Sequence, residues 1–371
     1  MTRWAQVSDR SLADDASLDA SALAAAAGRA QIFNATNAPS SRLIFQVVRN
    51  RPEVASIVAT AFMALREEAA SWTEMPGNLS GNQSWNMLWS WSKPKINWAD
   101  LNVWQKVNHF QEARQLTRKD NLKRHIARFR NIPGKLGEAF NIMPLTYTLP
   151  GEYVQFCTEF AKGYDKDQAG NMWIMKPAGS SRGRGIFVFN DIGAVSYSEV
   201  VIVQRYVDRP LLLDGYKFDL RLYVLVTSME PLEAFTHRQG FARLSSERYT
   251  NDSDSISNRY IHLTNSSINR HNPNGIQQES MQKDGALPGG SKISLEYLEK
   301  RLKEMNIEWD PLWTKINQVV LKTLYAVQGQ VVASPNSFEL FGFDVLIDTN
   351  LKCWLIEVPP QPSPINLKPS C

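Results

Sequence analysis

The sequence of 371 residues predicts a mixed fold of the α/β (α+β) class, because strand-like and helix-like segments both occur along it. Met172–Met175 and Ile186–Phe189 are short apolar runs typical of buried strands, and the small residues between them indicate a turn. Charged residues at every second position of Tyr216–Val226 indicate another strand. By contrast, Asn121–Arg130 carries apolar residues at helical spacing. The length exceeds that of a typical single domain, so we expect two or three packed domains.

The loop between the first two runs is rich in glycine and arginine. Glycine lets backbone N–H groups approach phosphate oxygens closely, and Lys176 at the end of the first strand adds a positive charge. A strand follows the loop, which argues against a P-loop or a Rossmann fingerprint, since both need a helix there. We therefore expect a hairpin that covers the phosphates of a nucleotide, with a simple turn as the alternative. The loop residues concerned are Gly179, Arg182, Gly183, Arg184 and Gly185.

One face of the strand Tyr216–Val226 is charged. Lys217, Asp219 and Arg221 share this face because side chains alternate across a strand, and Tyr223 continues it. Such a stripe can be the solvent face of an antiparallel sheet. The mixed charges and the apolar continuation of the strand favour a polar cleft instead.

Two carboxylates are predicted to meet across a hairpin near the C-terminal end. Asp344 lies within the apolar run Phe338–Ile347, Glu357 lies within Trp354–Val358, and a turn-like segment at 348–350 separates the two runs. A hairpin pairs residues equidistant from its turn, so the carboxylates are expected side by side, where they would repel. Mg²⁺ takes few protein carboxylates and completes its shell with phosphate and water. The pair therefore indicates a metal site, with outward-facing side chains as the alternative.

Seven ordered blocks carry a resemblance to a known family. They are LTRKD (116–120), WIMKPAGSSRGRGI (173–186), VQRYVDRPLLLDGYKFDLRLYVLVTS (203–228), HRQGFAR (237–243), RYIHLTNSSIN (259–269), FELFGFDVLID (338–348) and WLIEV (354–358). In these blocks the sequence resembles the tubulin tyrosine ligase-like family, and the SSRGRGI loop is similar to that of the glutamate-adding members. The resemblance implies an ATP-grasp fold with a smaller N-terminal domain, and with central and C-terminal mixed-sheet domains that enclose the nucleotide.

The expected domain boundaries combine this resemblance with composition. Residues 1–30 include the Ala-rich, low-complexity segment Leu12–Ala30 and are expected to form an N-terminal tail. We expect an N-terminal domain at 31–115, a central ATP-grasp domain with the glycine-rich loop at 116–210, and a C-terminal ATP-grasp domain with the metal-binding carboxylates at 211–371.

The resemblance also implies a role for individual residues. The residues implied to bind ATP are Lys119, Lys176, Ser181, Arg182, Gly183, Gly185, the adenine-holding segment Gln204, Arg205, Tyr206 and Val207, and then Lys217, Asp219, Thr264 and Asn265. Those implied to act in catalysis are Arg221, which faces the amino-acid substrate, Arg243 at the transfer site, and Lys217. Asp344 and Glu357 match two of the three ligands of Mg²⁺ in the family.

The activity that the resemblance implies is ATP-dependent amide formation through an acyl phosphate. In the glutamate-adding members, glutamate is joined to glutamate side chains in the C-terminal tails of tubulin, so the expected partners are microtubules and free glutamate. Glycine or tyrosine ligation is the alternative within the family. The implied location is the cytoplasm and the cytoskeleton, including the axoneme or basal body of a cilium or flagellum.

One residue departs from the family pattern. The third metal ligand of the family is an asparagine two residues after the glutamate, but this chain has Pro359 there. Proline has no side-chain oxygen and no backbone N–H. A different class of function therefore remains as an alternative, namely a catalytically weak tubulin- or microtubule-binding member of the family.

Charge and cysteine content exclude several other classes. The net charge is +4, and between Lys106 and Lys135 nine basic residues face only two acidic ones. Such a run is usually a solvated helix face, but beside an enzyme for acidic tails it indicates a docking surface. No nucleic-acid motif accompanies it, so we expect no nucleic-acid partner. The three cysteines are too few for a disulfide framework, and no uncharged apolar run approaches 18 residues, so no membrane span is expected.

Overall fold

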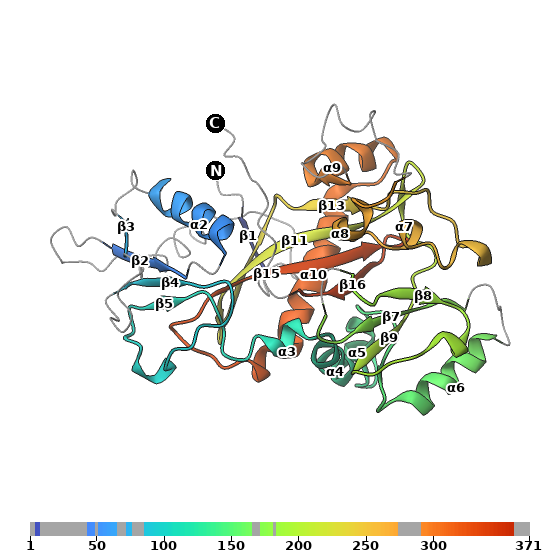
Figure 1. Ribbon diagram of the computed structural model, residues 1–371, viewed down its shortest axis with the longest axis horizontal. Helices are drawn as coiled ribbons and strands as arrows, with labels where there is room; N and C mark the ends of the chain where they lie inside the picture. Colours follow the sequence, from blue (N-terminus) through green and yellow to red (C-terminus); the bar gives the residue numbers. More distant parts are fainter. Residues whose placement is uncertain are drawn as a thin grey trace. The chain divides into compact units, whose positions relative to one another are not determined.

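The computed structural model describes residues 4–7, 43–48, 51–64, 72–75, 85–164, 171–180, 183–273 and 291–359 (Figure 1). The chain divides into two compact units. The larger unit comprises Met1–Gln6, Glu112–Val332 and Leu340–Cys371, and the smaller comprises Val7–Gln111 and Ala333–Glu339. Helices and several sheets make up the described residues, which confirms the predicted α+β class. The domain boundaries drawn from the sequence stay predictions.

The main sheet of the larger unit is organised around the long strand β11 (Tyr216–Met229), and eight of the described strands belong to it. Its antiparallel neighbours β12 (Leu232–His237) and β13 (Phe241–Leu244) lie on either side, and β14 (Lys292–Ser294) pairs with β13. β15 (Glu339–Ile347) pairs with β11 and with β16 (Cys353–Glu357). The remaining strands are β1 (Trp4–Val7) beside β12 and β10 (Leu212–Leu213) beside β11.

A second sheet in the larger unit is antiparallel throughout. Its order is β6-β9-β7-β8, from β6 (Thr146–Leu149), β9 (Val201–Arg205), β7 (Trp173–Pro177) and β8 (Phe187–Phe189). Trp173 pairs with Phe189 and Met175 with Phe187, which confirms the hairpin predicted around the glycine loop. Helix α6 (Tyr153–Tyr164) covers this sheet through Phe156, whose ring centroid lies 5.2 Å from that of Trp173.

Helices of the larger unit pack through apolar stripes. In α4 (Lys119–Arg130), Leu122 and Ile126 are buried while Arg124 and Arg128 are exposed, as the helical spacing predicts. α9 (Leu295–Glu304) buries its leucines, and Met305, which follows the helix, is 40% exposed. The other helices are α3 (Arg114–Thr117), α5 (Lys135–Ala139), α7 (Arg259–His262), α8 (Ser266–Asn269) and α10 (Trp309–Val327), with 3-10 turns at Ile192–Ala194, Ser253–Ser255 and Gln328–Gln330.

The smaller unit holds a parallel sheet of order β3-β2-β4-β5, beside helix α2 (Pro52–Ala64) and a 3-10 turn at Trp98–Asp100. Its strands are β2 (Leu43–Val47), β3 (Trp72–Glu74), β4 (Met87–Trp89) and β5 (Lys106–Val107). Trp85 is buried against Met75 and Leu88 and belongs to the core of this unit. In the described part of the chain, no helix is both long and apolar enough to span a membrane.

Candidate functional site

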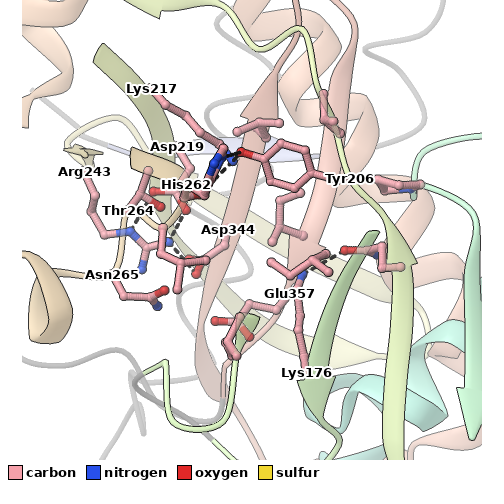
Figure 2. A pocket seen from close by; sticks show the side chains of 18 of the residues that line it. Lys176, Tyr206, Lys217, Asp219, Arg243, His262, Thr264, Asn265, Asp344 and Glu357 are labelled. Atoms are coloured by element: carbon pink, nitrogen blue, oxygen red, sulfur yellow. Dashed lines mark hydrogen bonds and ion pairs between the residues drawn. The ribbon is translucent and has the colours of Figure 1, made fainter. Parts of the chain in front are cut away.

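A cavity in the larger unit gathers most of the residues that the sequence singled out (Figure 2). The second sheet contributes β7 and β9, and the main sheet contributes β11, β13, β15 and β16. Side chains from distant parts of the sequence therefore converge on one space. The predicted residues that line it are Lys176, Gln204, Arg205, Tyr206, Val207, Lys217, Asp219, Arg243, Thr264, Asn265, Asp344 and Glu357.

The charged face of β11 points to the protein interior. Lys217, Asp219 and Arg221 are each more than nine-tenths buried, although the sequence alone left a solvent face possible. β13 lies opposite this part of β11, with Asp219 paired to Arg243 and Arg221 paired to Phe241. Because directly opposed residues project to the same side of a sheet, the charges of both strands share one face. Of the two alternatives left by the sequence, a polar cleft and a solvent-exposed face, the structure has the polar cleft.

Two guanidinium groups and two carboxylates form a buried network on this face. Arg243 donates from Nε to Asp219 over 2.7 Å and from Nη2 to Asp344 over 2.7 Å. Arg221 donates from Nη2 to Asp344 over 3.0 Å, and its Nε also contacts that carboxylate. Burial alone would raise the pKa of Asp344, but Arg221 and Arg243 outweigh it and hold the pKa well below its usual range. Asp344 is therefore ionised across the physiological range.

The hairpin of β15 and β16 brings the two predicted metal ligands together. Asp344 and Glu357 are paired across the strands, but the pairing depends on a register shift. Counting from the turn through Val345 and Leu355 would place Asp344 opposite Ile356, and the irregularity between Asp344 and Val345 places Glu357 there instead. Asp348 holds the turn, since its Oδ1 accepts the backbone N–H groups of Asn350 and Lys352 at 2.9 and 3.0 Å. The turn thus sets the register as far as Val345 and Leu355, and the shift beyond this pair places both carboxylates opposite each other at the cavity.

These two carboxylates fit a divalent cation only in part. Both line the cavity and are hard oxygen donors of the kind that Mg²⁺ prefers. However, Asp344 already binds two guanidinium groups, and Glu357 lies 3.1 Å from the Lys119 ammonium. No group of three or more His, Cys, Asp or Glu side chains in the described ranges could hold a metal ion. A cation here would need further oxygens from a bound ligand and from water.

Two lysines in the cavity have no direct carboxylate partner among the described residues. Lys176 donates to Gln204 Oε1 over 2.8 Å, and Lys217 donates to the Tyr206 hydroxyl over 2.7 Å. Burial lowers the pKa of Lys176 to about 8 and the pKa of Lys217 to about 7. Both ammonium groups are thus held by neutral oxygens, and a negatively charged ligand would stabilise their charged forms.

His262 lines the cavity, although no role was predicted for it from the sequence. Its Nε2 lies 3.1 Å from the Ser255 carbonyl, and a carbonyl only accepts, so this nitrogen carries the proton. Nδ1 then accepts from the Tyr206 hydroxyl at 3.0 Å, and that oxygen in turn accepts from Lys217. Burial, followed by the nearby Lys217 charge, lowers the pKa of His262 to about 4 and keeps the ring neutral. The sequence signal that could have identified it is its place in the RYIHLTN block, two residues before Thr264.

The glycine loop and Lys119 lie beside the cavity. Gly183 and Gly185 have φ angles of +73° and +66°, which a side chain would disfavour, so glycine is required at both positions. Lys119 donates to the Ser180 carbonyl over 2.9 Å, and Arg259 Nη2 donates to the Gly183 carbonyl over 2.9 Å. Ser181 and Arg182 lie outside the described residues, so their predicted roles stay predictions.

Lys292 is a second residue that sequence reasoning missed. It lies on β14 directly opposite Arg243. Its ammonium lies 5.1 Å from the centre of the Phe241 ring, and no described acidic side chain pairs with it. Burial, followed by the charge of Arg243, lowers its pKa. A lone lysine in a short strand carries no sequence signal, because only the sheet register places it next to Arg243.

Comparison with known sequences identifies the family. The profile described as "Tubulin-tyrosine ligase family" matches residues 98–370. The chain belongs to this family. The resemblance stated from the sequence blocks is thereby confirmed, and the mixed sheets of the structure are consistent with the ATP-grasp-like fold of the family.

Several relatives within the family carry the name of tubulin polyglutamylase. The chain is 37% identical over 299 residues to "Tubulin polyglutamylase TTLL5" of Mus musculus, which covers 76% of this chain and 22% of that protein. It is 34% identical over 333 residues to "Probable tubulin polyglutamylase TTLL2" of Homo sapiens, covering 89% and 54%. It is 35% identical over 301 residues to "Tubulin polyglutamylase ttll-5" of Caenorhabditis elegans, covering 76% and 40%. The chain thus spans only part of the length of each relative.

Gly342 on β15 makes room for the arginine that binds Asp344. A Cβ atom at this position would lie 3.3 Å from Cδ of Arg221 and 3.5 Å from Cγ of Pro359. Arg221 cannot easily move away, because its guanidinium is held by Asp344. We expect Gly342→Ala to lower the free energy of unfolding by about 1 kcal/mol more than Gly329→Ala does.

The control has the same gain in backbone rigidity, since a Cβ at Gly329 would meet nothing within 4 Å. Urea denaturation of both variants measures the difference. Equal stabilities would show that the space beside Arg221 can accept a methyl group.

Proposed function

We propose that this chain is an ATP-dependent carboxylate–amine ligase that adds glutamate to glutamate side chains in the C-terminal tails of tubulin. The observation that carries the proposal is a cavity in which two buried lysines lie together with the carboxylate pair Asp344 and Glu357. The names of the relatives support the choice of glutamate and of tubulin.

Binding of ATP would require the neutralisation of phosphate charge. Lys176 and Lys217 are buried and lack carboxylate partners among the described residues, so each can donate N–H groups to phosphate oxygens. The segment Gln204–Val207 would hold the adenine, and Thr264 with Asn265 would lie at the terminal phosphate. Asp344 and Glu357 would hold Mg²⁺, which supplies further neutralisation when bound.

Amide formation needs an activated carboxylate, because an ionised carboxylate is a poor electrophile. Transfer of the terminal phosphoryl group of ATP to the acceptor carboxylate gives an acyl phosphate and ADP. The amine nitrogen of glutamate then attacks the carbonyl carbon and loses a proton, and phosphate leaves. The contribution of the protein is positioning and fixed charge around these groups.

Arg221 and Arg243 have donors left for the substrates. Each guanidinium uses Nε and Nη2 toward the buried carboxylates, and its Nη1 makes no hydrogen bond within the part of the chain that the structure describes. Lys292 adds a positive charge beside Arg243. The Tyr223 hydroxyl is buried and has no hydrogen-bond partner in the described ranges, so it could donate to the same ligand. These four groups would hold the carboxylates of glutamate and of the acceptor.

The partner surface proposed for the acidic tail is the exposed side of α4. Arg124 and Arg128 are exposed, and neither pairs with a described carboxylate, whereas Lys123 on the same helix binds Glu152. Free positive charges attract acidic peptides over a distance set by the salt concentration. The cytoplasm and the cytoskeleton, including a cilium or flagellum, are the proposed location, because tubulin is the proposed substrate.

A second candidate function rests on Pro359, the residue after Val358 that is half-buried near Gly342. Proline offers no side-chain oxygen at the position where the family pattern has a metal ligand. A chain of this kind could bind microtubules with weak catalysis. Glycine and tyrosine ligation remain the alternatives within the enzyme class.

Incorporation of radiolabelled glutamate, glycine and tyrosine into purified microtubules with Mg²⁺ and ATP tests the proposed activity. We expect label from glutamate alone, and its loss in Glu357→Gln, because the neutral amide removes one negative ligand. Pro359→Asn should change the rate less than threefold in a competent enzyme. A large gain from Pro359→Asn, starting from almost no label, would instead support the weak binder.

The role of Lys292 is tested by its methionine variant. Lys292→Met keeps the apolar stem but removes the charge, so we expect KM for glutamate or for the tail to rise about tenfold with ATP affinity unchanged. Lys300→Met, on the exposed side of α9, is the control. Steady-state kinetics with each substrate varied separately identify the carboxylate concerned. An unchanged KM for both glutamate and the tail would show that Lys292 binds neither carboxylate.

Nucleotide binding should take up protons above neutral pH. The pKa values of Lys217 and Lys176, about 7 and about 8, mean that both are partly neutral at pH 8 in the empty cavity. A bound phosphate raises these pKa values, so between one and two protons (about 1.4) should enter per ATP at pH 8 and almost none at pH 6. Calorimetry in buffers of different ionisation enthalpy measures this number. Proton release at pH 8 would contradict the assignment of both lysines to the phosphates.

A further inference from the structure

A chain of hydrogen bonds runs from Lys176 away from the cavity to Thr146 on β6. Lys176 Nζ donates to Gln204 Oε1 over 2.8 Å, and Gln204 Nε2 donates to Thr146 Oγ1 over 2.9 Å. The Thr146 hydroxyl donates to the Pro144 carbonyl over 2.7 Å. Thr146, Gln204 and Lys176 are all more than nine-tenths buried, so water does not replace these partners.

The sheet register produces this arrangement. Thr146 on β6 and Gln204 on β9 are directly opposed, and their side chains therefore project to the same side. Lys176 on β7 is paired with Ile202, which makes it the diagonal neighbour of Gln204. The Gln204 side chain thus lies between one residue of each neighbouring strand.

The groups at the two ends of this series of hydrogen bonds determine the direction of every bond in it. An ammonium group only donates and the Pro144 carbonyl only accepts, so every bond between them must point from Lys176 toward Pro144. The amide of Gln204 has one orientation that satisfies this order, with its oxygen toward Lys176. Thr146 is the residue that selects this orientation, because its hydroxyl accepts from the amide while donating to the carbonyl.

We propose that Thr146 is a positioning residue for nucleotide binding, which it serves by fixing the Gln204 amide and, through it, the Lys176 ammonium. Thr146 does not line the cavity, and so it acts without contact with the ligand. One N–H of the ammonium is committed to Gln204, and the other two are directed by that bond. The link to nucleotide rests on the function proposed above, whereas the link to Lys176 does not.

Thr146→Val tests the inference, since it removes the hydroxyl but keeps the branched shape. The Gln204 amide then loses its acceptor on one side, and it can turn its N–H groups toward Lys176. In the ligand-free protein, NMR of ¹³C-labelled lysine should show the midpoint of the Lys176 titration lowered by about one pH unit, the loss of one buried hydrogen bond. The affinity for Mg²⁺ with a non-hydrolysable ATP analogue should fall about tenfold.

Two comparisons separate positioning from a general loss of stability. Thr146→Ser keeps the hydroxyl and should restore the titration and the affinity, and Thr158→Val removes an exposed hydroxyl on α6 that also donates to a carbonyl. In a Gln204→Met background, Thr146→Val should have no further effect on either readout. An unchanged titration in Thr146→Val, or an equal effect in both backgrounds, would overturn the inference.

The two proposals fail in different ways. If the unmodified chain bound no nucleotide, the proposed function would fall, but the titration of Lys176 would still decide the role of Thr146. If the chain bound nucleotide and the titration did not move, only the role of Thr146 would be rejected.

Discussion

The pairing of charge inside the larger unit is the constraint on which its site depends. Asp219 and Asp344 are buried beside Arg221 and Arg243, and every one of these four groups has an oppositely charged partner. Removal of one partner would leave a charge unpaired in the interior, at a cost of about 3–5 kcal/mol. The partners come from β11, β13 and β15, so the network requires these three strands to keep their register. The register of these three strands is therefore required both for the fold and for the site.

The surroundings of this network make the cavity receptive to anions. The two carboxylates are balanced by the two guanidinium groups, while Lys176 and Lys217 add positive charge that only neutral oxygens contact directly among the described residues. The pKa values of these lysines are lowered because burial destabilises their charged forms. The charged forms of both lysines are thus less stable in the empty cavity than they would be beside an anion, and a bound phosphate would stabilise them. This preference follows from the protein side chains alone.

Much of the site could be predicted from local patterns, and the rest depends on contacts between distant strands. The alternation of Lys217 with Asp219 predicted a shared face, because this rule acts within one strand. The predicted hairpin placed Asp344 and Glu357 near each other, although their direct pairing needs a register shift that the sequence does not show. Lys292 and Thr146 carried no such signal. Each is adjacent to the site only because β14 pairs with β13 and β6 with β9, and a single sequence does not reveal these registers.

The turn held by Asp348 has a consequence for the order of folding. Its carboxylate binds two backbone N–H groups and, through Oδ2, the indole of Trp354 at 2.9 Å, all within six residues. Hairpins of this kind close within microseconds, whereas pairing β15 with β11 must close a loop of more than a hundred residues. The carboxylate pair can therefore be assembled locally and early. The arginines that neutralise Asp344 reach it only in a later, slower step.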